Sequence, residues 1–154
     1  MKHNNKLLII NQLDKKLQQF RPLAKASVPS EGWIKAIRKA LNMSLSQLGS
    51  RISITPQSIK HIESRETKGT VTLNTLKEVA EALNLKLVYG FVPHDGTLEK
   101  MIERKASEIA KKIVKRTSTT MKLEDQENSQ ARINQAIKEL TAELKREVPK
   151  GLWD

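Results

Sequence analysis

The chain contains no cysteine, and aromatic residues make up only 3% of its 154 residues. Without cysteine it can form no disulfide framework, no thiolate nucleophile and no zinc finger. The three histidines, at positions 3, 61 and 94, are too scattered to show the spacing of metal ligands. The scarcity of aromatic rings argues against proteins that stack the bases of RNA or of single-stranded DNA. We therefore expect no metal site and no cofactor.

Long apolar runs and catalytic motifs are also missing from the sequence. The longest apolar run, Leu7–Ile10, is too short to cross a membrane or to form the core of a signal peptide. The sequence shows no glycine-rich phosphate loop, nucleophile elbow or His-Glu-x-x-His pattern. It therefore predicts a cytoplasmic protein with no membrane association, no catalytic residues and no enzyme activity.

Positive charge dominates the chain, because 28 Lys and Arg residues against 17 Asp and Glu give a formal net charge of +11. This excess indicates a polyanionic partner, most simply DNA. One run of cations without an acid comprises Lys111, Lys112, Lys115, Arg116 and Lys122. The run fits either a helix end, where cations favour the helix dipole, or an additional phosphate-contacting surface.

Residues 44–66 carry the pattern of two short helices joined by a tight turn. Ser44 is a good N-cap, and Gln47 follows at the spacing of a capping box. Thr55 predicts the cap of the second helix, and Pro56 suits its first turn because no backbone N–H is needed there.

The second of these helices predicts an apolar side and a polar side. Ile59 and Ile62 face a core at helical spacing, which leaves Gln57, Lys60 and His61 on the outer side. A helix pair with so short a turn is the helix-turn-helix, whose second helix enters the major groove of duplex DNA.

Amphipathic segments flank this pair on both sides. The segment 30–41 places Trp33, Ile34, Ile37 and Leu41 at helical spacing, and the segment 73–83 does so with Leu73, Leu76, Val79, Ala80 and Leu83. Four short helices of this kind can share one small core. We therefore expect a helical domain over residues 30–84.

Residues 30–84 resemble the DNA-binding domain of lambda-type phage repressors and their bacterial relatives, the XRE family. The resemblance implies a structural ion pair between Arg38 and Glu63. It implies base contacts from Thr55, Pro56, Gln57, Lys60 and His61, and phosphate contacts from Ser44, Leu45, Ser58, Arg65, Thr67 and Lys68. Two positions depart from the family pattern: Leu45 replaces a common Gln, and Ser53 replaces a common Gly in the turn. The second departure predicts a turn that avoids positive φ.

The remaining segments predict extensions of this domain. Residues 1–29 read as a helix over 5–20 followed by an extended arm, which would pack on a partner subunit, reach a neighbouring groove or stay disordered. Residues 94–154 read as helices over 98–116 and 121–148, which would form an antiparallel hairpin or extend a dimer interface. Trp153 is then either a docking anchor or part of a loose tail.

Residues 85–93 give the best strand signal in the chain, with Leu85, Leu87, Val88, Tyr89 and Phe91 in a β-rich run that stops at Pro93. A lone strand leaves its backbone groups unpaired, so we expect pairing with the same strand of a second subunit in a homodimer. The antitoxin half of HipBA-type modules is similar in this placement. Pairing with residues 1–10 is the intramolecular alternative.

The full arrangement is similar to the group called mobile mystery protein A. The matching stretches are Gly32-Trp33-Ile34, the segment 87–93, and Thr-Met-Lys-Leu-Glu-Asp-Gln near residue 120. This resemblance implies an autorepressor that is the antitoxin-like partner of a Fic-domain protein, bound as a dimer to an inverted repeat in the nucleoid. Two alternatives remain: a stand-alone repressor of a phage or mobile element, and a protein-binding inhibitor that keeps the helix-turn-helix only as a scaffold. The expected fold is mainly α, with one intersubunit strand and a C-terminal helical extension.

Overall fold

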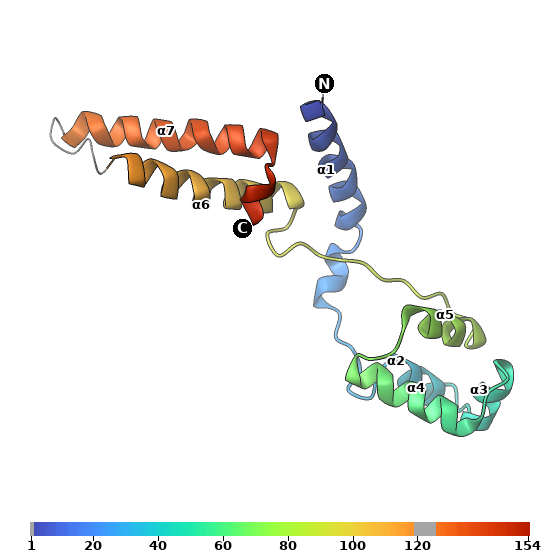
Figure 1. Cartoon of the computed structure of the whole chain (residues 1–154). Helices are drawn as coiled ribbons and strands as arrows, with labels where there is room; N and C mark the ends of the chain where they lie inside the picture. Colours follow the sequence, from blue (N-terminus) through green and yellow to red (C-terminus); the bar gives the residue numbers. More distant parts are fainter. Residues whose placement is uncertain (1, 119–125) are drawn as a thin grey trace. The chain divides into compact units, whose positions relative to one another are not determined.

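The computed structural model describes residues 2–118 and 126–154, and the regular secondary structure in these ranges is helical (Figure 1). The chain divides into two compact units. We call Lys25–Tyr89 the central unit, and Met1–Ala24 together with Gly90–Asp154 the terminal unit. None of the helices in the described ranges combines the length and the apolar character that crossing a bilayer requires.

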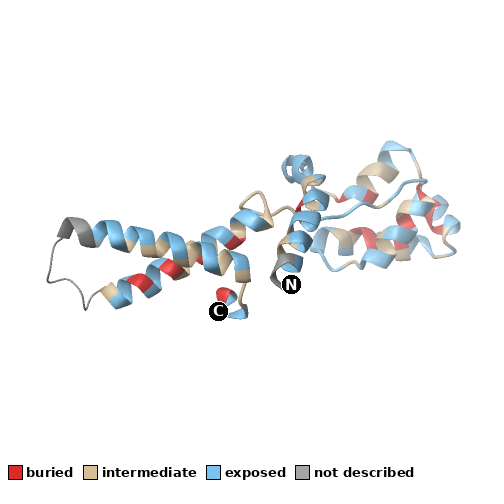
Figure 2. Cartoon of the chain, turned by 90° about the horizontal axis from the view of Figure 1, so that it is seen from above, coloured by how far each residue is buried: buried red, intermediate tan, exposed pale blue. Residues whose placement is uncertain are grey.

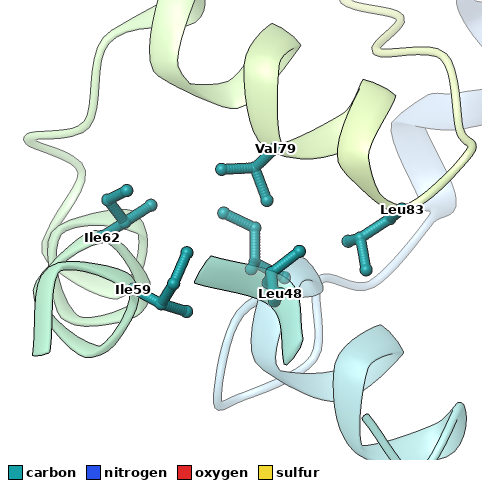
Figure 3. Close-up of a cluster of buried hydrophobic side chains, with 6 residues drawn as sticks. Leu48, Ile59, Ile62, Val79 and Leu83 are labelled. Carbon is teal, nitrogen blue, oxygen red and sulfur yellow. The ribbon is translucent and has the colours of Figure 1, made fainter. Parts of the chain in front are cut away.

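The central unit consists of four helices, α2 (Trp33–Ala40), α3 (Leu45–Arg51), α4 (Pro56–Lys68) and α5 (Leu73–Ala82). Its core comprises the buried side chains of Ile34, Leu48, Ile59, Ile62, Val79 and Leu83 (Figure 3). Ile34, Ile59, Ile62, Val79 and Leu83 belong to the apolar stripes that the sequence predicts, and Leu48 is the buried leucine of α3. Trp33, Leu41 and Leu73 belong to the same stripes but are about half exposed. Each of them lies at the first residue or the C-cap of its helix.

The helix starts around the tight turn agree with the sequence. Ser44 Oγ accepts a hydrogen bond from the N–H of Gln47 at 3.0 Å, and Gln47 Oε1 accepts one from the N–H of Ser44 at 2.8 Å. This is the predicted capping box of α3. Thr55 caps α4 by accepting a hydrogen bond from the N–H of Ser58 at 3.1 Å, and Pro56 is the first residue of that helix.

The turn itself corrects one expectation. Ser53 has a φ of 56°, so the prediction that its turn avoids positive φ was wrong. The reason is the short connection, which brings the N–H of Ile54 back to the carbonyl oxygen of Gly49 at 2.9 Å. The approach is so close that a Cβ at Gly49 would lie 2.5 Å from the oxygen of Ile54. The tight turn therefore dictates a left-handed residue even though that residue is not glycine.

Helix α2 begins later than the sequence indicates, at Trp33 instead of Ser30. Gly32, with a φ of 84°, precedes it and supplies no capping side chain. The cap comes instead from Glu66 on α4, whose carboxylate accepts hydrogen bonds from the N–H groups of Trp33 and Ile34 at 2.8 and 2.9 Å. An acidic group is favourable there because it faces the positive end of the helix dipole.

The predicted strand over residues 85–93 is a second correction. The structure has no β-strand in residues 2–118 and 126–154, and residues 85–93 run as a connection without regular secondary structure. The alternative pairing with residues 1–10 is also wrong, because helix α1 (Lys2–Gln18) occupies that segment. A strand needs the backbone of a neighbour, and no described segment of the chain supplies it. Of the five predicted strand residues, Leu87 is half-buried, and Leu85, Val88, Tyr89 and Phe91 are exposed.

The terminal unit is built on an antiparallel hairpin of α6 (Leu98–Ser118) and α7 (Gln126–Glu147) (Figure 1). Its buried residues recur every four positions along α6, at Ile102, Ala106, Ala110 and Val114 (Figure 2). The predicted start of the second helix at Met121 lies outside the described residues, as does Lys122. The hairpin is the arrangement that the sequence offers as one of two alternatives.

The C-terminal end anchors to this hairpin through a residue that the sequence does not single out. Leu152, in the 3-10 helix η2 (Lys150–Trp153), is only 1% exposed and packs with Ile102 and Ala106. The neighbouring Trp153 is 48% exposed, so it is not the anchor.

Helix α1 is fixed to the start of α6 by a buried carboxylate. Asp14 accepts hydrogen bonds from the N–H groups of Leu98 at 2.7 Å and Glu99 at 3.2 Å. Farther along, a Cβ at Gly90 would come within 2.5 Å of the ring of Phe20, which marks a close contact. A short 3-10 helix, η1 (Arg21–Lys25), takes the place of the first part of the expected extended arm.

Candidate nucleic-acid interface

Helix α4 presents one polar face to solvent. Ile59, Ile62 and Glu63 are buried on its inner side. Gln57, His61 and Lys68 are exposed and follow one another at intervals of four and seven residues. This spacing places the three side chains in one row on the opposite side of the helix.

The five predicted base-contacting residues all lie at the N-terminal end of α4, and all are exposed. The hydroxyl of Thr55 is occupied, because it caps the helix and lies 2.9 Å from the hydroxyl of Ser58. Pro56 has no side-chain donor. Gln57, Lys60 and His61 are therefore the residues whose polar groups are available to a ligand, since none of them bonds to another described residue.

The six predicted phosphate-contacting residues divide into two groups. Arg65 and Lys68 are exposed cations at the C-terminal half of α4. The other four have side chains that are engaged within the central unit. Ser44 caps α3, Leu45 packs against the core, Ser58 pairs with the cap of α4, and Thr67 donates a hydrogen bond to the carbonyl of Ser64 at 2.8 Å.

The ion pair between Arg38 and Glu63 holds α2 against α4. Arg38 Nε lies 2.6 Å from Glu63 Oε1, and the side chains are only 11% and 6% exposed. Arg38 also donates a hydrogen bond to the carbonyl of Met43 at 2.9 Å, which ties the loop before α3 to the same pair. The pair faces away from the row on α4, so its part is to keep that helix in position.

A groove runs along one flank of α4, with a volume of about 290 Å³. Its walls come from the turn, α4 and α5, and are lined by Ile52, Ile54, Ser58, His61, Ile62, Arg65, Thr75, Glu78 and Val79. Ser58 therefore lies on the groove side of α4. His61 and Arg65 are exposed at its border with the outer face.

The electrostatics of the central unit favour an anionic ligand. Residues 25–89 include ten Lys or Arg and five Asp or Glu. Four of the five carboxylates are engaged inside the unit: Glu63 pairs with Arg38, Glu66 caps α2, Glu31 lies 3.1 Å from Lys39, and Glu78 accepts a hydrogen bond from Asn74. The exposed row on α4 contains no acid, and such a surface attracts the phosphates of a nucleic acid.

Comparison with known proteins agrees with this geometry. Residues 34–89 match a family model described as helix-turn-helix, which corresponds to the XRE type of this domain. The match covers α2 to α5 and part of the connection that follows. A search of curated proteins and a search of solved structures each gave no significant match.

Proposed function

We propose, from the XRE-type helix-turn-helix domain in residues 34–89, that this protein is a sequence-specific DNA-binding transcriptional regulator. The observation that carries the proposal is the exposed, acid-free outer face at the start of α4, where Gln57, Lys60 and His61 have no partner among the described residues. A Gln side chain can bond to the N6 and N7 atoms of adenine, and cationic side chains favour guanine. The core and the Arg38–Glu63 pair hold this helix rigid, as base recognition requires.

The substitution Gln57→Ala tests this assignment. A preferred duplex is first selected from random sequences with the full chain, and affinities are then measured at a fixed salt concentration. We expect the variant to lose about 1–3 kcal/mol and to relax the preference at one or two base pairs. Gln12→Ala, at an exposed Gln on α1, is the matched control and should change neither quantity. Unchanged preference in Gln57→Ala, or equal wild-type affinity for every duplex, would remove the proposal.

A homodimer on an inverted repeat is part of the same proposal. A two-fold dimer would place two copies of α4 on the same side of the duplex, with half-site centres about 10–10.5 base pairs apart or a multiple of that distance. The support on the chain is three exposed apolar side chains that are close in sequence in the connection after α5: Val88, Tyr89 and Phe91 are 61%, 56% and 77% exposed. Burial of such side chains in a partner would stabilise association.

Sedimentation tests the dimer. Replacing Val88, Tyr89 and Phe91 together with Ser should give a monomer with weakened operator binding. The control replaces Leu8 and Ile9, which are also exposed, with Ser and should leave the assembly unchanged. A wild-type chain that sediments as a monomer at tens of micromolar, yet binds the inverted repeat without cooperativity, would argue against the dimer.

The resemblance to mobile mystery protein A adds a Fic-domain protein as partner, which would make the chain an antitoxin and autorepressor. Co-expression with a Fic-domain protein encoded beside it should give a complex that survives purification. DNA binding without such a complex would favour the alternative that the chain is a stand-alone repressor of a phage or mobile element. A complex without DNA binding would leave the protein-binding inhibitor.

A further inference from the structure

The α6–α7 hairpin differs in charge between its two halves. In residues 98–108 and 139–147, near α1, five Lys or Arg stand against six Glu. In residues 109–138, the distal half, seven Lys or Arg stand against three acids. All three of those acids fall in the connection and the first turn of α7, at residues 124, 125 and 127.

The near half pairs three of its five cations with carboxylates. Lys145 lies 3.1 Å from Glu99 and 3.6 Å from Glu103, which ties α7 to α6. Arg104 pairs with Asp95 at 3.0 Å and with Glu108 at 2.9 Å, and Lys105 lies 4.0 Å from Glu108. Lys100 and Arg146 form no ion pair with another described residue. Three of the five cations of this half therefore stabilise the hairpin.

Five cations of the distal half have no such role. Lys111, Lys112 and Lys115 on α6, and Arg132 and Lys138 on α7, are exposed and form no ion pair with another described residue. We call Lys111, Lys112 and Lys115, which share one side of α6 at spacings of three and four residues, the hairpin patch. Residues 109–118 and 130–138 include no Asp or Glu.

The helix dipole explains only part of the hairpin patch. Its effect is confined to the last turn of a helix, so it favours Lys115 on α6, which ends at Ser118. Lys111 is two turns from that end.

The composition of the hairpin patch favours phosphate over a protein or lipid ligand. Lys is depleted in the cores of protein interfaces, whereas flexible exposed Lys is a common phosphate contact. A membrane-binding helix needs a broad apolar face. The apolar row of α6 is buried, the large apolar residues described on α7 are half-buried, and Ile113 is the large apolar side chain of α6 that is exposed beside these lysines.

We propose that the hairpin patch is a second DNA-binding surface, which contacts backbone phosphates without reading base sequence. This inference rests on the proposed function, since it assumes that α4 selects the site. The hairpin patch would add affinity and salt dependence on any duplex, whereas the row on α4 would supply the preference.

The experiment compares two triple variants of equal net charge in the full chain. The test variant carries Lys111→Gln, Lys112→Gln and Lys115→Gln. The matched control carries Lys15→Gln, Lys16→Gln and Lys100→Gln, at lysines that are also exposed and unpaired among the described residues. Affinities for the selected duplex and for an unrelated duplex are measured from about 50 to 200 mM salt, the range over which counterion release is resolved. Thermal melting checks that both variants fold.

We expect the test variant to reduce the log–log salt slope by about 2–3 for each bound copy on both duplexes. The ratio of the two affinities should not change, and the control should keep the wild-type slope. Equal slopes in the two variants would overturn the inference, because only net charge would then matter. A wild-type slope in the test variant, combined with lost binding to vesicles of anionic lipid, would also overturn it. Failure of the proposed function can be told apart from failure of this inference, because the wild-type chain would then show no preferred duplex.

Discussion

The central unit and the terminal unit differ in the sequence separation between a helix N-terminus and the carboxylate that caps it. Each contains a helix whose N-terminus is capped by a carboxylate on another helix: Glu66 caps α2, and Asp14 caps α6. Glu66 and Trp33 are 33 residues apart, whereas Asp14 and Leu98 are 84 apart.

The two cores also differ in how far apart in the sequence their residues lie. The central core is formed by helices that follow one another in the chain. The terminal core joins α6 to the two ends of the chain, through Ile10 and Leu152. Closing a long loop costs more conformational entropy than closing a short one. The contacts of the terminal unit therefore offset a larger entropy cost than those of the central unit. We therefore expect the terminal unit to be the less stable one, and the substitutions below test the difference.

The largest effect should come from Arg38→Met in the central unit. The variant leaves the buried carboxylate of Glu63 without its partner, which should lower the free energy of unfolding by about 3–5 kcal/mol. DNA binding should fall only as far as the folded population falls. Lys39→Met breaks the ion pair with Glu31, in which the Lys39 side chain is 57% exposed. This variant should lower the free energy of unfolding by less than about 1 kcal/mol. Chemical denaturation measures both, and equal effects would contradict the structural role of Arg38.

Leu152→Ala should be next and should act on the terminal unit. Removal of this fully buried side chain should cost about 2–4 kcal/mol. Hydrogen exchange should show the loss of protection in α6 and α7 while α2 to α5 keep theirs. Trp153→Ala should have a much smaller effect because that side chain is half exposed. A larger effect from Trp153→Ala would mean that the wrong residue has been taken as the anchor.

Removal of either carboxylate that caps another helix, Asp14 or Glu66, should have a smaller effect, and the two effects should be similar. Asp14→Ala and Glu66→Ala each remove two hydrogen bonds to a helix N-terminus, which should cost about 1–2 kcal/mol. Limited proteolysis should show α1 becoming sensitive in Asp14→Ala, and hydrogen exchange should show a frayed α2 in Glu66→Ala. If Asp14→Ala frayed α2 and Glu66→Ala made α1 sensitive to proteolysis, the separate roles of the two caps would be refuted.

The smallest effect concerns pH. Hydrogen bonding to Glu99 and the charge of Glu103 raise the pKa of Lys145 above its ordinary value of 10.5. Because the folded pKa is the higher one, this stabilisation is complete below about pH 10.5 and is lost as the pH rises through the folded pKa. Lys145→Gln should therefore destabilise the hairpin by no more than about 0.5 kcal/mol at pH 7. The difference from wild type should vanish at strongly alkaline pH, and a difference that grew there would reverse the assigned sign.

The candidate site was only partly predictable from sequence. Helical periodicity places Gln57, Lys60 and His61 on the outer side of α4, and the structure leaves them exposed. The same reasoning treats Ser58 and Thr67 as available to DNA, but their hydroxyls bond within the central unit. Periodicity gives the direction of a side chain, whereas the use of its hydroxyl depends on neighbours that pattern alone does not reveal.

The sequence by itself determined the helices of the central unit, their inner faces, and the caps at Ser44 and Thr55, because these depend on residues within one or two turns. Only the tertiary structure decided what depends on distant partners. It placed Glu66 and Asp14 as caps and chose Leu152 over Trp153 as the anchor. It also left residues 85–93 without a strand, since β propensity needs the backbone of a neighbour before it becomes structure.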